Sequence, residues 1–185
     1  MKNRCFWVSD DPLYIEYHDK EWGKPVYDDE TLFEFLLLES FQAGLSWITI
    51  LKKREHFRKA FDNFDYRKIA TYDEKKFNEL IVNEGIIRNR LKIKAAIVNA
   101  QLFMEIQKEF GSFSTFIWSF VSGTPIVNKF ETREEVPATT EISDAISKAL
   151  KKRGFKFVGS TIIYAFMQAT GMVNDHTTNC FCYPN

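Results

Sequence analysis

Four residues near the two ends of the chain are of the types that bind zinc. Cys5 and His18 lie in the first 20 residues, and His176 and Cys180 lie in the last ten. Zinc favours four sulfur or nitrogen ligands in a tetrahedral array, and the second pair is spaced so that two side chains converge from one helical turn. A site made this way would join the two ends. Buried thiols beside surface histidines explain the same spacing, since neither pair has the Cys-x2-Cys pattern.

The remaining cysteine and the remaining histidine are not expected to have a functional role. Three cysteines are an odd number, and in a chain expected to be intracellular a disulfide is disfavoured, so Cys182 is interpreted as a spare thiol. His56 lies in a charged stretch and is expected to be solvated.

A second group combines one carboxylate with flat aromatic rings. Glu39 follows the apolar run 35–38, so a helix places it beside Phe35 rather than on a charged face. A carboxylate against aromatic surface is costly unless it finds a partner or a cationic ligand. The pattern therefore describes a pocket for a flat, cationic or donor-rich heterocycle, or an aromatic core with Glu39 at its edge, which is the commoner arrangement. The rings belong to Trp7, Tyr14, Tyr17, Trp22 and Trp47.

The segment 42–47 and the distribution of charge bear on nucleic acid. Gly44 permits a tight turn, from which Leu45 either inserts between base steps as an apolar wedge or packs between helices. The 25 Lys and Arg balance the 25 Asp and Glu, which argues against a uniformly basic nucleic-acid binder. Locally, however, the charges are separated. All charged residues in 28–41 are acidic, whereas those in 85–94 and 148–156 are basic.

The two basic stretches have different interpretations. A glycine-bearing turn opening onto a helix, as in 85–94, offers backbone N–H groups and basic side chains to a DNA phosphate, although solvated helix ends account for it equally. For 148–156 the solvated helix end is the favoured interpretation, because the helix dipole favours Lys and Arg there. Regional patches bind DNA even at zero net charge.

Helices are expected to position all of these residues. Acidic starts, apolar periodicity and glycine stops predict helices over 29–41, 46–54, 71–83, 89–110, 143–153 and 160–170. The start at Thr71 has the form of a capping box, and Gly85, Gly111 and Gly154 mark helix ends. Alternation typical of strands is nearly absent, so the sequence predicts an all-α fold in a single domain of residues 1–185.

Composition sets the remaining limits. With 45% hydrophobic and 27% charged residues, 8 Gly and 5 Pro, the 185-residue chain is neither disordered nor collagen-like. No apolar run approaches the roughly 20 residues that span a bilayer, and the N-terminus lacks a signal-peptide core. A cytoplasmic protein with no membrane contact is expected.

Together these residues resemble a known family over nearly the whole chain. The sequence is similar to 3-methyladenine DNA glycosylase I, the constitutive alkylation-repair family of bacteria. The similarity is specific because its motifs run from end to end in the family's order. The matching stretches are Cys5-x-Trp7, Asp11-Pro12-Leu13-Tyr14, Tyr17-His18-Asp19, Glu21-Trp22-Gly23, Gln42-Ala43-Gly44-Leu45-Ser46-Trp47, Leu51-Lys52-Lys53-Arg54-Glu55, the run 148–159, and Asn174-Asp175-His176 with Cys180.

The resemblance implies a fold and a metal. The fold would be that of the helix-hairpin-helix DNA glycosylases, with two helical lobes and the hairpin near 85–94. One structural Zn2+ per chain would tie the N- and C-terminal segments, held by Cys5, His18, His176 and Cys180.

The resemblance also implies roles at the base and on the DNA. Glu39, Tyr17 and Trp47 would form the catalytic base pocket, and Trp7 and Trp22 would line or support it. The residues expected on the DNA are of two kinds, those that fill or wedge the gap left by the extruded nucleotide and those of the basic hairpin. They are Gln42, Gly44 and Leu45 for the gap and Arg88, Arg90 and Lys92 for the hairpin.

The activity implied is excision of 3-methyladenine from alkylated double-stranded DNA after base flipping. Methylation at N3 makes the adenine cationic and its glycosidic bond weak, so little protonation by an enzyme acid is needed. Residues 105–112 lack the Gly-Pro-Asp motif of many superfamily members, and no lysine nucleophile is evident. A monofunctional hydrolase without lyase activity, acting as a monomer and releasing free 3-methyladenine, is therefore expected. The alternatives are a zinc-stapled module that recognises damage without cutting, and a purine-binding protein.

Overall fold

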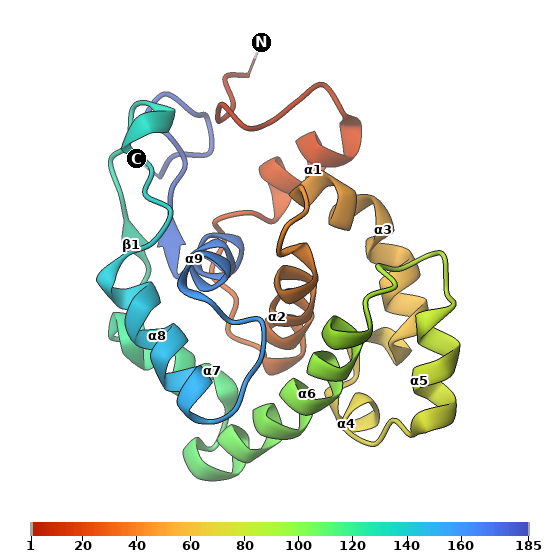
Figure 1. Ribbon diagram of the computed structural model, residues 1–185. Coiled ribbons are helices and arrows are strands. Elements are labelled where there is room, and N and C mark those ends of the chain that lie inside the picture. The colour runs from red at the N-terminus through yellow and green to blue at the C-terminus, as the bar shows by residue number, and fades with distance from the viewer. Residues whose placement is uncertain (1, 185) are drawn as a thin grey trace.

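The computed structural model describes residues 2–184, and most of the regular structure in them is helical (Figure 1). The α-helices are α1 (Pro12–Lys20), α2 (Asp29–Gln42), α3 (Trp47–Ala60), α4 (Tyr66–Ile69), α5 (Glu74–Ile81), α6 (Arg90–Phe110), α7 (Phe113–Trp118), α8 (Glu141–Lys152) and α9 (Ser160–Ala169). Single turns of 3-10 helix are η1 (Asp62–Phe64), η2 (Ser119–Val121) and η3 (Arg133–Glu135). The strands β1 (Ile126–Val127) and β2 (Val173–Asn174) pair in parallel.

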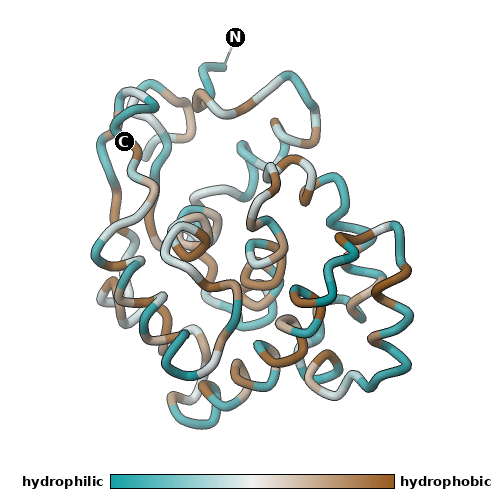
Figure 2. Tube along the Cα trace, in the orientation of Figure 1, coloured by the Kyte–Doolittle hydropathy of each residue, from teal (hydrophilic) through white to brown (hydrophobic). Residues whose placement is uncertain are grey.

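Helix α2 forms the centre of the fold. Its residues 32–41 are all buried, and a helix that is apolar nearly all round belongs in a core. Its start is fixed by Asp28, whose carboxylate accepts a hydrogen bond of 2.8 Å from the N–H of Thr31. Helices α3, α6, α7 and α9 pack around it, and Figure 1 shows α2 and α9 side by side in the middle. In Figure 2 hydrophobic and hydrophilic residues alternate along α6 and α8, as expected for helices with one buried side.

Most of the predicted helices are present, and two of them begin elsewhere. Helix α5 is capped by Asp73, which accepts from the N–H of Lys76 at 2.9 Å, not by Thr71. The Thr71 hydroxyl instead donates to the carbonyl of Lys68 at the end of α4. Helix α8 is capped by Thr140 and begins at Glu141, two residues before the predicted start at Ser143.

Helices α1, α4 and α7 and the short strands were not predicted from the sequence. Helices α4 and α7 contain four and six residues, too few to show a helical periodicity. Helix α1 has the N-terminal signals Asp11 and Pro12, but it buries only Tyr17 and His18 and so lacks an apolar periodicity. The two strands contain two residues each, too few for an alternating pattern. None of these elements changes the predominantly helical class.

The two ends of the chain lie on the same side of the molecule (Figure 1). The N–H of Phe181 donates to the carbonyl of Asn3 at 2.9 Å, and the Asn3 amide donates to the carbonyl of Asn179 at 2.7 Å. Gly171 lies where the returning chain crosses the segment after α1, at φ +69°. A Cβ there would lie 2.3 Å from the carbonyl carbon of Lys24. No helix within residues 2–184 is long and apolar enough to span a membrane.

Candidate active site and metal cluster

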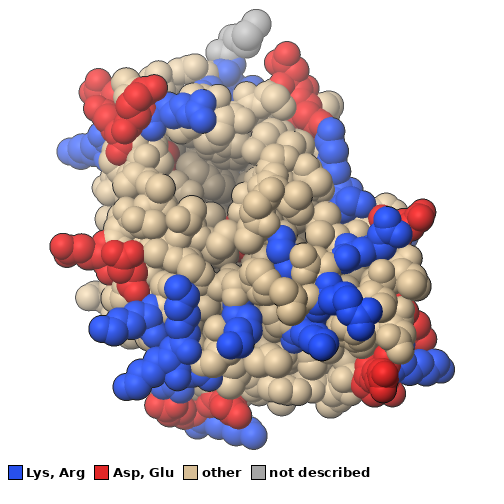
Figure 3. Space-filling view, viewed as in Figure 1, with Lys and Arg blue, Asp and Glu red and all other residues tan. Residues whose placement is uncertain are grey.

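A cavity of about 310 Å³ lies between the N-terminal helices and α9 and is visible as the hollow in Figure 3. This volume is at the lower end of the range for small-molecule sites. One wall comes from the first 47 residues and the other from residues 136–175. The first wall contains Phe6, Trp7, Tyr14, Tyr17, Trp22, Glu39, Gln42 and Trp47; the second contains Val136, Pro137, Ala138, Thr161, Tyr164, Ala165, Gln168 and Asp175.

Glu39 is the buried carboxyl group of the first wall. Its side chain projects from the last turn of α2, and the residue is only 3% exposed. Burial raises the pKa of Glu39 to about 8, because the ionised form loses its hydration there. The pKa values of Tyr14 and Tyr17 are also raised, first by burial and then by the charge of Glu39. Burial therefore favours the neutral carboxylic acid form of Glu39.

The aromatic rings of this wall form a connected group. The rings of Tyr17 and Trp47 are 5.5 Å apart between centroids, and those of Trp7 and Trp22 are 5.0 Å apart. The indole Nε1 atoms of Trp7 and Trp47 are buried, and neither has a hydrogen-bond partner among the described residues. The prediction that these rings surround Glu39 in a pocket holds geometrically, and the alternative of a closed aromatic core does not.

The opposite wall carries a second carboxylate that the sequence did not single out for a role. Asp175 is 2% exposed and accepts hydrogen bonds from Tyr164 at 2.5 Å, Gln168 at 2.9 Å and Asn128 at 2.7 Å. Three donors satisfy its oxygens. The segment 174–176 appears among the matching motifs, but only the fold shows that Asp175, directly after β2, lies against α9 at the cavity.

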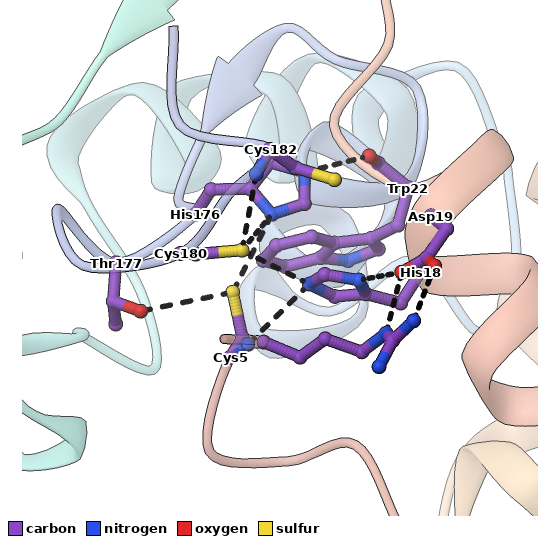
Figure 4. Close-up of polar contacts among 9 residues, drawn as sticks. Cys5, His18, Asp19, Trp22, His176, Thr177, Cys180 and Cys182 are labelled. Atoms are coloured by element: carbon purple, nitrogen blue, oxygen red, sulfur yellow. Dashed lines mark hydrogen bonds and ion pairs between the residues drawn. The ribbon is translucent and has the colours of Figure 1, made fainter. Parts of the chain in front are cut away.

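The predicted metal ligands come together in a buried cluster (Figure 4). Their ligand atoms all lie within 4.8 Å of one another, and each residue is buried. Cys5 Sγ is 3.4 Å from His176 Nδ1, and Cys180 Sγ is 3.4 Å from His18 Nε2 and 3.6 Å from His176 Nδ1. Zinc bonds of about 2.3 Å to sulfur and 2.0–2.1 Å to nitrogen place tetrahedral S and N ligands about 3.6 Å apart, so this donor set fits zinc.

The outer nitrogens of both histidines are held by hydrogen bonds. His18 Nδ1 lies 2.8 Å from the carboxylate of Asp19, and His176 Nε2 lies 3.0 Å from the carbonyl oxygen of Trp22. Arg4 donates twice to Asp19 at 2.8 Å and, with His18, holds the pKa of that carboxyl at about 2. Such partners orient metal-binding imidazoles. Burial raises the pKa of the Cys5 thiol to about 12, a cost that a bound cation would offset.

The basic turn lies between α5 and α6, in residues 82–89. Asn89 caps α6 by accepting from the N–H of Lys92 at 3.0 Å, and Asn83 accepts from the N–H of Gly85 at 2.8 Å. Arg88 and Arg90 are exposed, as a role on a DNA backbone requires.

Lys92 does not share that exposure. It is 7% exposed, and its ammonium donates to the carbonyls of Phe41 at 2.8 Å and Ala43 at 2.7 Å. The expectation that Lys92 contacts phosphate is therefore wrong. Its ammonium instead satisfies carbonyl groups at the C-terminal end of α2, which have no partners within their helix. Lys92 instead joins the start of α6 to the segment 42–45.

The segment 42–45 forms the rim of the cavity. Gln42 lines the cavity, and its side-chain amide donates to the carbonyl of Leu45 at 2.7 Å, closing the turn around Gly44. Gly44 is exposed at φ +79°, which favours glycine. Leu45 is partly buried against the core, so part of its side chain is left for another contact.

Comparison with known proteins places this geometry in a family. The family model described as methyladenine glycosylase matches residues 7–183. The chain belongs to the methyladenine glycosylase family. This confirms the resemblance seen in the sequence.

Relatives of this methyladenine glycosylase are similar over their full length. DNA-3-methyladenine glycosylase 1 of Escherichia coli (strain K12) is 55% identical over 181 residues, which cover 98% of this chain and 97% of the relative. DNA-3-methyladenine glycosylase of Haemophilus influenzae is 52% identical over 182 residues, 98% of each chain. A solved structure that concerns 3-methyladenine recognition by 3-methyladenine DNA glycosylase I from Staphylococcus aureus is 38% identical, with a TM-score of 0.96 over 100% of this chain and 98% of that one.

Proposed function

We propose that this methyladenine glycosylase hydrolyses the N-glycosidic bond of 3-methyladenine in alkylated double-stranded DNA, after the nucleotide is rotated out of the stack. The observation that carries the proposal is a buried carboxyl, Glu39, set among aromatic rings in a cavity large enough for one base. The names of the relatives point to the same base and the same reaction.

The cavity suits a flat cation. A methylated purine in the cavity would lie against the adjoining rings of Tyr17 and Trp47, and aromatic faces attract positive charge. Its charge would favour ionisation of Glu39, since an opposite charge lowers the pKa of a carboxyl that burial has raised to about 8. Glu39 would then accept hydrogen bonds from the base, and the base would displace no internal partner of that carboxyl.

The chemistry follows from the leaving group. The cationic base departs neutral, so the protein has mainly to hold it and to stabilise the positive charge that develops on the sugar. Two buried carboxyl groups, Glu39 and Asp175, line the cavity. No lysine lines it among the described residues, which supports a hydrolase that forms no Schiff base with the sugar and has no lyase step.

DNA binding is assigned to two exposed elements beside the cavity. Arg88 and Arg90 of the α5–α6 turn would contact the phosphate backbone in helix-hairpin-helix fashion, without reading sequence. Gln42 and Leu45, on the rim, would occupy the gap left by the extruded nucleotide. Lys92 supports this rim from inside.

A single Zn2+ would be held by Cys5, His18, His176 and Cys180. When bound, it supplies a structural cross-link between the N- and C-terminal segments. The cluster would take no part in the chemistry at Glu39. Its four side chains would fill all four coordination positions of the zinc ion and leave none open for substrate.

The test is release of 3-methyladenine from methylated duplex DNA, measured by chromatography. Wild-type protein should release the base, and Glu39→Gln should lose most of this activity and bind free 3-methyladenine more weakly. Glu105→Gln, which changes an exposed carboxylate of α6, is the matched control and should behave like wild type. Binding of methylated duplex without release would favour a damage-recognition module, and binding of the free base without duplex a purine-binding protein.

A further inference from the structure

Helix α8 presents three lysines on one side. Lys148, Lys151 and Lys152 are spaced i, i+3 and i+4, so their side chains are neighbours on the helix surface, and all three are exposed. No ion pair within residues 2–184 involves any of them. Adjacent like charges on a helix repel one another, and an anionic partner relieves that cost. We call this surface the α8 lysine face.

We propose that the α8 lysine face binds the phosphate backbone of the duplex on the other side of the extruded nucleotide from the α5–α6 turn. The inference rests on the proposed function, because it takes duplex DNA as the substrate. It adds a second DNA-binding surface to the proposed function. From the sequence alone, the favoured interpretation of the basic stretch 148–156 is a solvated helix end.

The helix dipole does not account for the whole face. Lys151 and Lys152 lie in the last turn of α8, where the dipole favours cations, but Lys148 lies a turn earlier. The next residue, Arg153, is already engaged, since its guanidinium donates to both carboxylate oxygens of Glu109 at 2.6 and 3.0 Å. The lysines differ from Arg153 in having no such carboxylate.

The α8 lysine face continues to the rim of the cavity. A shallow groove along α8 is lined by all three lysines, by Asp144 and Ser147, and by Ser160, the first residue of α9. The next residue along the chain, Thr161, lines the cavity. The one acid in this groove, Asp144, accepts a hydrogen bond from Ser160 at 2.5 Å and so faces α9. A backbone seated in the groove would lead directly to the cavity opening.

Figure 3 shows both basic regions on the face that contains the hollow. Lysine and arginine side chains gather over α8 at the lower left and over the start of α6 and the α5–α6 turn at the right, below the cavity opening. Acidic side chains lie mainly at the margins of this view. A strand that enters at one region and leaves at the other would pass beneath the opening.

The spacing between the two regions is fixed by hydrogen bonds. Asn99 of α6 is 3% exposed and holds both sides of Lys156, accepting from its N–H at 2.9 Å and donating to its carbonyl at 3.0 Å. Ser147 of α8 donates to the carbonyl of Val158 at 2.7 Å. The loop between α8 and α9 is thus attached to the helix that begins at the α5–α6 turn, and Lys156 is exposed on it.

The experiment compares two double variants by the salt dependence of DNA binding. Lys148→Gln with Lys152→Gln removes two charges of the face. Lys59→Gln with Lys68→Gln is the control and removes two exposed lysines, one near the C-terminal end of α3, about 18 Å from Trp47 along that helix, and one in α4. The probe is a duplex oligonucleotide with one tetrahydrofuran abasic-site analogue, and anisotropy gives the affinity between about 50 and 200 mM salt.

The expected result is a slope of log affinity against log salt that is shallower by about 2 for the α8 variant and unchanged for the control. Accordingly, the affinity lost by the α8 variant relative to wild type should be about tenfold larger at 50 mM than at 200 mM salt. Binding of free 3-methyladenine by both variants checks that the cavity is intact.

Two results overturn the inference, and they are distinguishable from failure of the proposed function. Equal slopes for the α8 variant and the control, with wild-type protein that binds duplex and releases base, remove only the second anchoring surface. The same holds if the α8 variant loses affinity for RNA or an acidic peptide but not for duplex DNA. Wild-type protein that neither binds the duplex nor releases base removes the proposed function and this inference together.

Discussion

Glu39→Gln is expected to make the folded chain more stable at alkaline pH while it removes base release. Glu39 is buried and has no hydrogen-bond partner among residues 2–184, so the folded state holds its proton up to a pKa of about 8, compared with the ordinary value of 4.5. In the unfolded chain the carboxyl ionises freely above about 4.5. Between these two values the unfolded state has lost the proton and the folded state still binds it, so wild-type stability falls as pH rises.

The size of the effect follows from the two pKa values. At about 1.4 kcal/mol per pH unit, the interval between 4.5 and about 8 corresponds to roughly 5 kcal/mol, reached above pH 8 and absent below pH 4.5. Penetration of water into the open cavity makes this an upper bound. Glutamine has similar size and no charge, so it carries none of this penalty. For a domain of this length, roughly 5 kcal/mol corresponds to a rise in Tm of about 10 °C or more.

The assay is thermal unfolding of wild type, Glu39→Gln and the exposed control Glu105→Gln between pH 5 and 9. The difference in Tm between Glu39→Gln and wild type should be small at pH 5 and grow steadily up to about pH 8. Glu105→Gln should show no such trend, because its carboxyl is exposed. A Tm difference that stays constant with pH would refute the reasoning, since it would mean that Glu39 is ionised in the folded cavity.

Three further predictions concern the metal cluster, the rim and the hairpin. Cys180→Ser should lower both the zinc content in elemental analysis and the Tm, whereas Cys182→Ser should retain the zinc. Equal effects would remove the ligand assignment. Lys92→Met should lower the free energy of unfolding by about 2 kcal/mol in urea titration, because two carbonyls at the end of α2 lose a charged donor. An unchanged unfolding midpoint would contradict this. Arg90→Gln should reduce the salt slope of duplex binding by about 1 and leave the binding of free 3-methyladenine unchanged. A loss of both would indicate a general defect in folding instead.

Residue chemistry singled out the four residues of the Cys/His cluster and one wall of the cavity. Cys5, His18, His176 and Cys180 stand out because the chain contains few other cysteines and histidines, and the fold brings all four together. Glu39 stands out because a carboxylate at the end of an apolar run conflicts with the helical pattern. Signals of this kind are local to a few residues, so they need no knowledge of the fold.

The other wall could not be predicted in the same way. Asp175 directly precedes the predicted ligand His176, but nothing in the sequence indicates that it faces the cavity, where Tyr164 and Gln168 of α9 hold it by hydrogen bonds. Lys92 shows the converse error. It lies in a basic stretch with Arg88 and Arg90, and only the approach of α6 to the end of α2 reveals that its ammonium is turned inward. Charge patterns along a chain do not show which side of a helix is covered.

The division of the cavity and the Cys/His cluster between the two ends of the chain determines when the site is assembled during synthesis. Residues 5 and 18 leave the ribosome well before their partners 176 and 180, which follow β2. A nascent chain that has emerged only as far as α8 has its α2 carboxyl and aromatic rings but lacks the α9 wall that faces them. The hydrophobic surface of α2 that α9 covers is exposed until then, and exposed apolar surface makes such an intermediate prone to aggregate. Base excision therefore begins only after α9 and the segment that follows it have docked.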